Sequence, residues 1–101
     1  MKITNLYSKN FSEIKDIQNE KLLEYNLFES KVDDKINYGI QITSFDGRNR
    51  EEYISEVICD NKEFVQDVVK YLYENSVDID TCEYVLNDLF INLNIKKQTI
   101  K

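Results

Sequence analysis

The chain has 101 residues, the length of one domain, and its hydrophobic fraction of 42% supports a single core. A net charge of −6 lacks the basic footprint that a nucleic-acid binder needs, and it is equally unsuited to an anionic membrane surface. No apolar run approaches the roughly 18 residues of a membrane-spanning helix. The first ten residues lack the basic-then-apolar pattern of a signal peptide. We therefore expect a cytoplasmic protein that binds neither nucleic acid nor membrane.

The acidic charge belongs to one part of the chain. Residues 1–50 are neutral overall, whereas residues 51–88 contain eleven acidic and two basic side chains, a net −9. Residues 89–101 add three lysines, Lys96, Lys97 and Lys101. A charged partner would therefore meet the C-terminal half of the chain.

The N-terminal segment shows no sustained hydrophobic period over residues 1–19. We interpret it as a flexible arm, with at most a short strand at Ile3–Tyr7. Residues 20–95 are then a single α+β domain, and residues 96–101 form a basic C-terminal tail.

Period-2 patterns begin at Lys21. Leu23, Tyr25 and Leu27 alternate with polar residues, and a polar turn follows at residues 32–35. The clearest alternation runs from Ile36 to Thr43 and predicts a second strand. The Asp46-Gly47 pair is typical of a tight hairpin, so we expect a third strand at about residues 51–59.

The hydrophobic period changes to that of a helix at Asp60. Asp60 and Glu63 follow a capping pattern, and the first helix should end near Asn75. Its predicted buried stripe comprises Phe64, Val65, Val68, Val69 and Leu72. Asp80 and Glu83 repeat the capping pattern for a second helix, whose predicted stripe comprises Cys82, Val85, Leu86, Leu89, Phe90 and Leu93.

This order of elements predicts an α+β fold. A three-stranded antiparallel meander would be followed by two amphipathic helices packed on one face of the sheet. A three-stranded sheet needs one covered face to be stable, and the two apolar stripes supply that cover.

The residues of the chain exclude most catalytic chemistries. With no histidine there is no imidazole base or Cys/His zinc site, and two glycines cannot form a phosphate-binding loop. We interpret Gly39, inside a strand, as a mark of close packing or a bulge. Asp78, Asp80 and Glu83 could be imagined as cation ligands, but favourable charges at a helix N-terminus explain them fully. We predict no catalytic residue, no metal and no cofactor.

The two cysteines have two interpretations. One disulfide between Cys59 and Cys82 is conceivable, but in the cytoplasm two reduced thiols are favoured. Small core hydrophobes account for both positions. A reactive thiol would need an electropositive setting, and the sequence neighbours are Asp60 and Glu83.

One side of the second helix carries apolar residues away from the predicted core. Tyr84, Ile91 and Ile95 fall on this outward side, with Asp88 beside them. Tyrosine is enriched at interface hot spots, so Tyr84, Asp88, Ile91 and Ile95 are our candidate protein-interface residues. Ordinary surface apolarity, or shielding by the N-terminal arm, is the alternative.

Three segments carry a resemblance to a known family. They are residues 38–42 (YGIQI) followed by Asp46-Gly47, residues 58–65 (ICDNKEFV) and residues 84–90 (YVLNDLF). This chain resembles a family of small uncharacterised proteins from clostridia and related Firmicutes, catalogued as a domain of unknown function. Family sequences typically carry a Ser/Pro-type turn between the helices, where this chain has residues 77–80 (VDID). The resemblance implies a fold and a host, and it implies no catalytic residue.

Three functions compete at this point. The first is a non-catalytic regulator that contacts another protein, with a homodimer as one option. The second is an acidic nucleic-acid mimic that inhibits a basic protein, as phage-type inhibitors do. The third is an enzyme with a carboxylate-only site, for which the spacing of acids offers no support. We favour the first and predict that the protein is not an enzyme.

Overall fold

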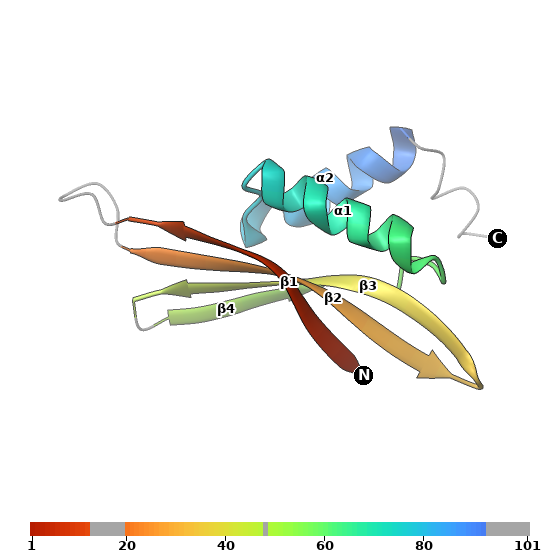
Figure 1. The fold of residues 1–101 in the computed structure, drawn as a ribbon. Coiled ribbons are helices and arrows are strands. Elements are labelled where there is room, and N and C mark those ends of the chain that lie inside the picture. The colour runs from red at the N-terminus through yellow and green to blue at the C-terminus, as the bar shows by residue number, and fades with distance from the viewer. Residues whose placement is uncertain (13–19, 48, 93–101) are drawn as a thin grey trace.

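The computed structural model describes residues 1–12, 20–47 and 49–92 and shows an α+β fold with two layers (Figure 1). One layer is an antiparallel sheet and the other is a pair of helices, both on the same face of the sheet. The sheet has the strand order β1-β2-β3-β4. The elements are β1 (Lys2–Phe11), β2 (Lys21–Val32), β3 (Lys35–Asp46), β4 (Asn49–Ile54), α1 (Lys62–Glu74) and α2 (Ile79–Asn92).

The prediction of a three-stranded sheet is wrong, because the sheet has a fourth strand. Residues 2–11, which the sequence assigned to a flexible arm, form β1 and pair with β2 along their length. The register shifts between Asn5 and Tyr7, and such an irregularity breaks the alternation that would identify a strand. Residues 13–19 of the expected arm lie outside the described part of the chain.

Tyr7 and Lys9 of β1 connect this strand to the end of α1. The rings of Tyr7 and Tyr73 stack with centroids 4.7 Å apart, and the ammonium of Lys9 lies 4.7 Å from the centre of the Tyr73 ring. Lys9 Nζ also donates to the Tyr73 carbonyl at 2.7 Å. The lysine thus provides the positive charge that stabilises the C-terminus of α1, whose own last turn has no basic residue.

The central hairpin agrees with the period-2 prediction. Leu23, Tyr25, Leu27, Ile40 and Ile42 are buried on the helix-facing side of β2 and β3. The two residues between these strands, Asp33 and Asp34, both have positive φ, 52° and 65°. Positive φ at both central positions is the feature of a type I′ turn, whose twist matches that of the strands.

The third predicted strand is shorter than expected. β4 ends at Ile54, and the chain then leaves regular pairing. It still follows β3, because Ser55 N–H donates to the Ile40 carbonyl and Ile58 N–H donates to the Tyr38 carbonyl. Residues 55–58 therefore act as an irregular extension of the sheet edge rather than as strand.

The helices turn the predicted stripes toward the core, but they bury only part of each stripe. The half-buried members, which pack against the edge of the core, are Phe64, Val85, Leu89 and Phe90. In α1, Val65, Val68, Val69 and Leu72 are buried, and in α2, Cys82 and Leu86 are buried. The N-cap of α1 is Asn61, whose side chain accepts from Phe64 N–H at 3.0 Å, and not Asp60 as predicted. α1 ends at Glu74 with Asn75 as its C-cap, in agreement with the end predicted near Asn75. Leu93 of the second predicted stripe lies outside the described residues.

The face of the sheet away from the helices carries a row of polar contacts across all four strands. Asn5 donates to Asn26 at 2.8 Å, Asn26 donates to Gln41 at 2.7 Å, and Gln41 donates to Glu52 at 2.6 Å. Asn26 and Gln41 are both buried. Because each buried amide has a partner, this face is stable without a second covering layer.

Gly39 lies on that same face under a phenylalanine ring. A Cβ at this position would lie 2.3 Å from Cε2 and Cζ of Phe28, its partner across the strands. Close packing, one of the two interpretations of this glycine from the sequence, is therefore confirmed.

In the described part of the chain, no helix has the length and apolar character needed to cross a membrane.

Candidate interaction surface

The outward side of α2 presents Tyr84 to solvent. Apart from Met1, Tyr84 has the largest exposed fraction among the described large apolar side chains, 72%. Asp80 and Asp88, four residues before and after it, are also exposed. Side chains at this spacing are neighbours on one side of a helix. We call Asp80, Glu83, Tyr84 and Asp88, all exposed, the outer face of α2.

The structure describes the side chains of two of the four candidate interface residues. Tyr84 and Asp88 lie on the outer face of α2. Ile91 belongs to α2, but its side chain lies outside the described residues, and so does the whole of Ile95. Of the outward Tyr-Ile-Ile row, Tyr84 is therefore the residue that the structure shows exposed on α2.

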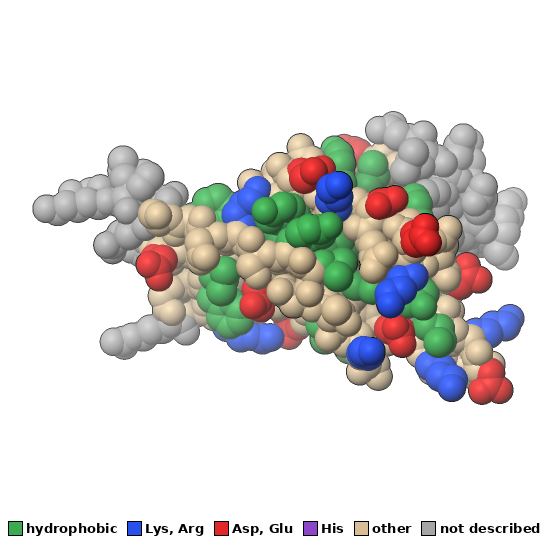
Figure 2. Space-filling view, viewed as in Figure 1, with side chains coloured by type: hydrophobic (Ala, Val, Ile, Leu, Met, Phe, Trp, Pro, Cys, Tyr) green, Lys and Arg blue, Asp and Glu red, His purple; other side chains and the backbone are tan. Residues whose placement is uncertain are grey.

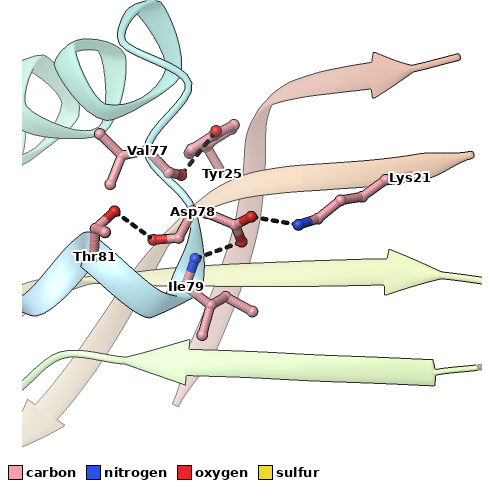
Figure 3. A network of polar contacts seen from close by, with 6 residues as sticks. All are labelled: Lys21, Tyr25, Val77, Asp78, Ile79 and Thr81. Atoms are coloured by element: carbon pink, nitrogen blue, oxygen red, sulfur yellow. Dashed lines mark hydrogen bonds and ion pairs between the residues drawn. The ribbon is translucent and has the colours of Figure 1, made fainter. Parts of the chain in front are cut away.

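The position of this face depends on how α2 begins. Figure 3 shows Asp78, the residue before α2, between the sheet and the helix. Lys21 Nζ of β2 donates to Asp78 Oδ2 and forms an ion pair with it. Asp78 Oδ1 accepts from Ile79 N–H at 2.7 Å, and the Asp78 carbonyl accepts from Thr81 N–H at 3.2 Å. Asp78 thus binds the first N–H of the helix and ties the helix to the sheet, whereas Asp80, the predicted capping residue, lies inside the first turn.

A second bond holds the same connection to β2 (Figure 3). The hydroxyl of Tyr25, on β2, donates to the Val77 carbonyl at 3.0 Å. The Tyr25 side chain is fully buried, and this burial, helped by the nearby Asp78 carboxylate, raises the pKa of Tyr25 to about 12. The hydroxyl therefore keeps its proton, and with it the hydrogen bond, over the physiological pH range.

The connection between the helices has its own backbone bonds. Val77 N–H donates to the Leu72 carbonyl at 3.0 Å, and Ser76 N–H donates to the Tyr73 carbonyl at 3.1 Å. Ser76 has a φ of 52°. These features make a Schellman motif, which ends α1 sharply and turns the chain toward α2.

Among the described residues, both thiols are free and the Asp78 carboxylate is held in an ion pair. Cys59 and Cys82 form no disulfide. Cys82 is fully buried, and burial raises its pKa to about 12, which keeps the thiol protonated and unreactive. Asp78, a candidate cation ligand from the sequence, pairs with Lys21 instead. Within the described ranges, no three acidic or cysteine side chains come together as a metal site would require.

Sequence reasoning missed the two bonds from β2. It assigned Asp78 to the acidic N-terminus of the second helix, which Asp78 does precede, but it gave no partner for the carboxylate. Lys21 lies 57 positions away in the sequence and Tyr25 lies 52 positions from Val77. The one local signal was an aspartate immediately before an amphipathic run, which is typical of a capping residue.

The surface seen with β1 and α1 in front has mixed charge. Figure 2 shows acidic and basic side chains interspersed over this side, with apolar atoms exposed at its centre. A surface of mixed charge is typical of a face exposed to solvent. It therefore offers no single-signed region in this view that would mark a second candidate surface.

Comparison with known proteins assigns the chain to a family of unknown function. No curated protein and no solved structure matches it. The model of a family of unknown function, DUF6514, matches residues 4–90, which include most of β1, the other three strands, α1 and most of α2. The chain therefore belongs to the DUF6514 family.

Proposed function

We propose that this protein is a non-catalytic regulator of the cytoplasm that acts by binding another protein through the outer face of α2. The observation that carries the proposal is the exposure of Tyr84. A tyrosine ring offers a large contact area at low conformational cost, and tyrosines are enriched among residues that dominate binding energy. An isolated exposed tyrosine on a rigid, well-anchored helix therefore supports a contact role.

The cytoplasmic setting and the host belong to the proposal as well. Two free cysteines support a reducing compartment. Isoleucine, asparagine, lysine and tyrosine are abundant and are encoded by AT-rich codons, which supports a host among the clostridia and related Firmicutes.

The anchoring of α2 supports a binding role for its outer face. Asp78 and Tyr25 hold the start of the helix to β2, so Tyr84 is carried on an element with a fixed orientation. A surface that is rigid before binding loses less entropy when the partner arrives. The same rigidity means that a substitution at Tyr84 changes the surface without changing the core.

The test is affinity capture from the native host followed by mass spectrometry, with the natural chain compared with Tyr84→Ser. Tyr71→Ser is the matched control, since Tyr71 is a tyrosine of the other helix and is 43% exposed. We expect Tyr84→Ser to lose a partner that Tyr71→Ser retains, with unchanged circular dichroism in both. Light scattering on the same three proteins reports whether the partner is a second copy. Identical partners and identical mass for all three would contradict the proposal.

A further inference from the structure

We infer that the outer face of α2 receives an arginine side chain from a basic partner, with the guanidinium stacked on the ring of Tyr84. The inference rests on the proposed function and adds the chemistry of the partner. Three observations carry it: the charge of α2, the position of its acids around Tyr84, and the way in which this protein already uses its aromatic rings.

The charge of α2 has one sign. Residues 79–92 contain three acidic side chains, Asp80, Glu83 and Asp88, and no lysine or arginine. All three are exposed. Within the described part of the chain, the ion pairs are Lys21 with Asp78 and Arg50 with Glu52, so none neutralises the outer face of α2. A partner surface of opposite sign would gain both in association rate and in specificity.

Two of these acids flank the tyrosine along the helix. Asp80 and Asp88 lie four residues to either side of Tyr84, and Glu83 precedes it. On a helix, residues four apart have Cβ atoms only about 5–6 Å from each other. A cation over the Tyr84 ring would therefore lie within reach of carboxylates on both sides, which combines ring and carboxylate attraction at one point.

The protein uses cations on aromatic rings elsewhere. Lys9 Nζ lies 4.7 Å from the centre of the Tyr73 ring, and Arg50 Cζ lies 5.8 Å from the centre of the Phe45 ring. Among the described residues, no cation occupies the ring of Tyr84 in this way. The Tyr84 ring, which has the largest exposed fraction among the described aromatic side chains, is therefore free to accept a cation from a partner.

Arginine fits this face better than lysine. The guanidinium is planar, stacks on an aromatic ring and binds carboxylates through a fork of donors, whereas the ammonium is a compact and strongly hydrated point charge. With one acid a helical turn before Tyr84 and another a turn after it, a stacked guanidinium can direct its donors toward Asp80 or Asp88. We therefore expect selectivity for arginine over lysine at equal charge.

The experiment titrates the full-length, ¹⁵N-labelled protein with blocked oligoarginine and oligolysine peptides of equal length, at low and at high salt. We expect oligoarginine to shift the backbone amides of residues 80–88 and to bind more tightly than oligolysine. High salt should weaken both peptides. Tyr84→Leu, which keeps an apolar side chain but removes the ring, should weaken oligoarginine binding by about two- to five-fold. Tyr71→Leu is the control and should leave it unchanged.

Three results would overturn the inference. They are equal affinity for the two peptides, equal affinity of the natural chain and Tyr84→Leu, and shifts centred on the acids of β4 (Glu51 and Glu52) instead of α2. Failure here is distinguishable from failure of the proposed function. If Tyr84→Ser loses its captured partner while oligoarginine does not bind, the protein interface at Tyr84 is supported and the recognition of arginine is contradicted. If oligoarginine binds as expected while Tyr84→Ser captures the same partners as the natural chain, the interface with a host protein is contradicted.

Discussion

Removal of the Tyr25 hydroxyl is the sharpest test of how α2 is held. In Tyr25→Phe the Val77 carbonyl loses a donor that lies 3.0 Å away in the natural chain. Both side chains belong to the buried core, so water cannot replace the lost donor freely. Leaving one buried polar group without its partner costs about 1–3 kcal/mol. At neutral pH we therefore expect Tyr25→Phe to lower the free energy of unfolding by about 1–2 kcal/mol.

The same substitution should reverse its effect at alkaline pH. The pKa of Tyr25 is raised in the folded state from 10.0 to about 12, so the folded state favours the protonated hydroxyl. Its contribution is fully present below pH 10 and is lost as pH rises toward 12. One such group lowers the free energy of unfolding by about 1.4 kcal/mol per pH unit in this window. By pH 12 the natural chain should have lost about 2 kcal/mol through Tyr25, whereas Tyr25→Phe loses none of it.

Denaturant unfolding followed by circular dichroism, at closely spaced pH values from neutral to alkaline, measures both effects. The buried Cys82 thiol, whose pKa is also raised, adds a slope of the same sign to both proteins, so their difference reports mainly Tyr25. We expect the two stabilities to converge as pH rises above 10 and to cross near the top of the window. A difference that stays constant with pH, or a variant as stable as the natural chain at neutral pH, would refute the reasoning.

Three further changes test other features. Gly39→Ala should lower the free energy of unfolding by about 1–3 kcal/mol, because its Cβ would meet the Phe28 ring at 2.3 Å. This loss of stability should largely vanish when Phe28 is also replaced by leucine. An equal loss in the natural and the Phe28→Leu backgrounds would contradict a clash with the ring. Asp34→Gly should raise that free energy by about 0.5 kcal/mol, since glycine adopts positive φ without steric cost; a loss measured by denaturant unfolding would oppose this. In a thiol-labelling assay on the native protein, Cys59 should react and Cys82 should stay protected until the protein unfolds. Equal labelling rates for the two thiols would contradict the burial of Cys82.

Local periodicity explains the elements that could be predicted. The β2–β3 hairpin has apolar residues at every second position, and both helices have apolar stripes at a helical spacing. Each pattern is contained within a dozen residues, so no knowledge of the rest of the fold is needed to read it. The outward direction of Tyr84 follows from the same logic, because the buried stripe of α2 determines which residues face away from it.

β1 could not be recognised in this way. It is an edge strand, so only one of its sides is paired, and the register shift between Asn5 and Tyr7 interrupts the alternation. β1 is stabilised by contacts with residues far along the chain, such as the ring and the carbonyl of Tyr73. A segment stabilised by distant contacts leaves no local pattern.

The acidic character of residues 51–88, the lack of histidine and the two amphipathic helices were determined by the sequence alone, because composition and period are local properties. The tertiary structure decided what makes α2 a defined surface. It brought Lys21 to Asp78 across 57 positions and the Tyr25 hydroxyl to the Val77 carbonyl across 52. Such pairs are specified by packing of the whole chain, since no local rule matches a lysine on one strand to an aspartate before a distant helix.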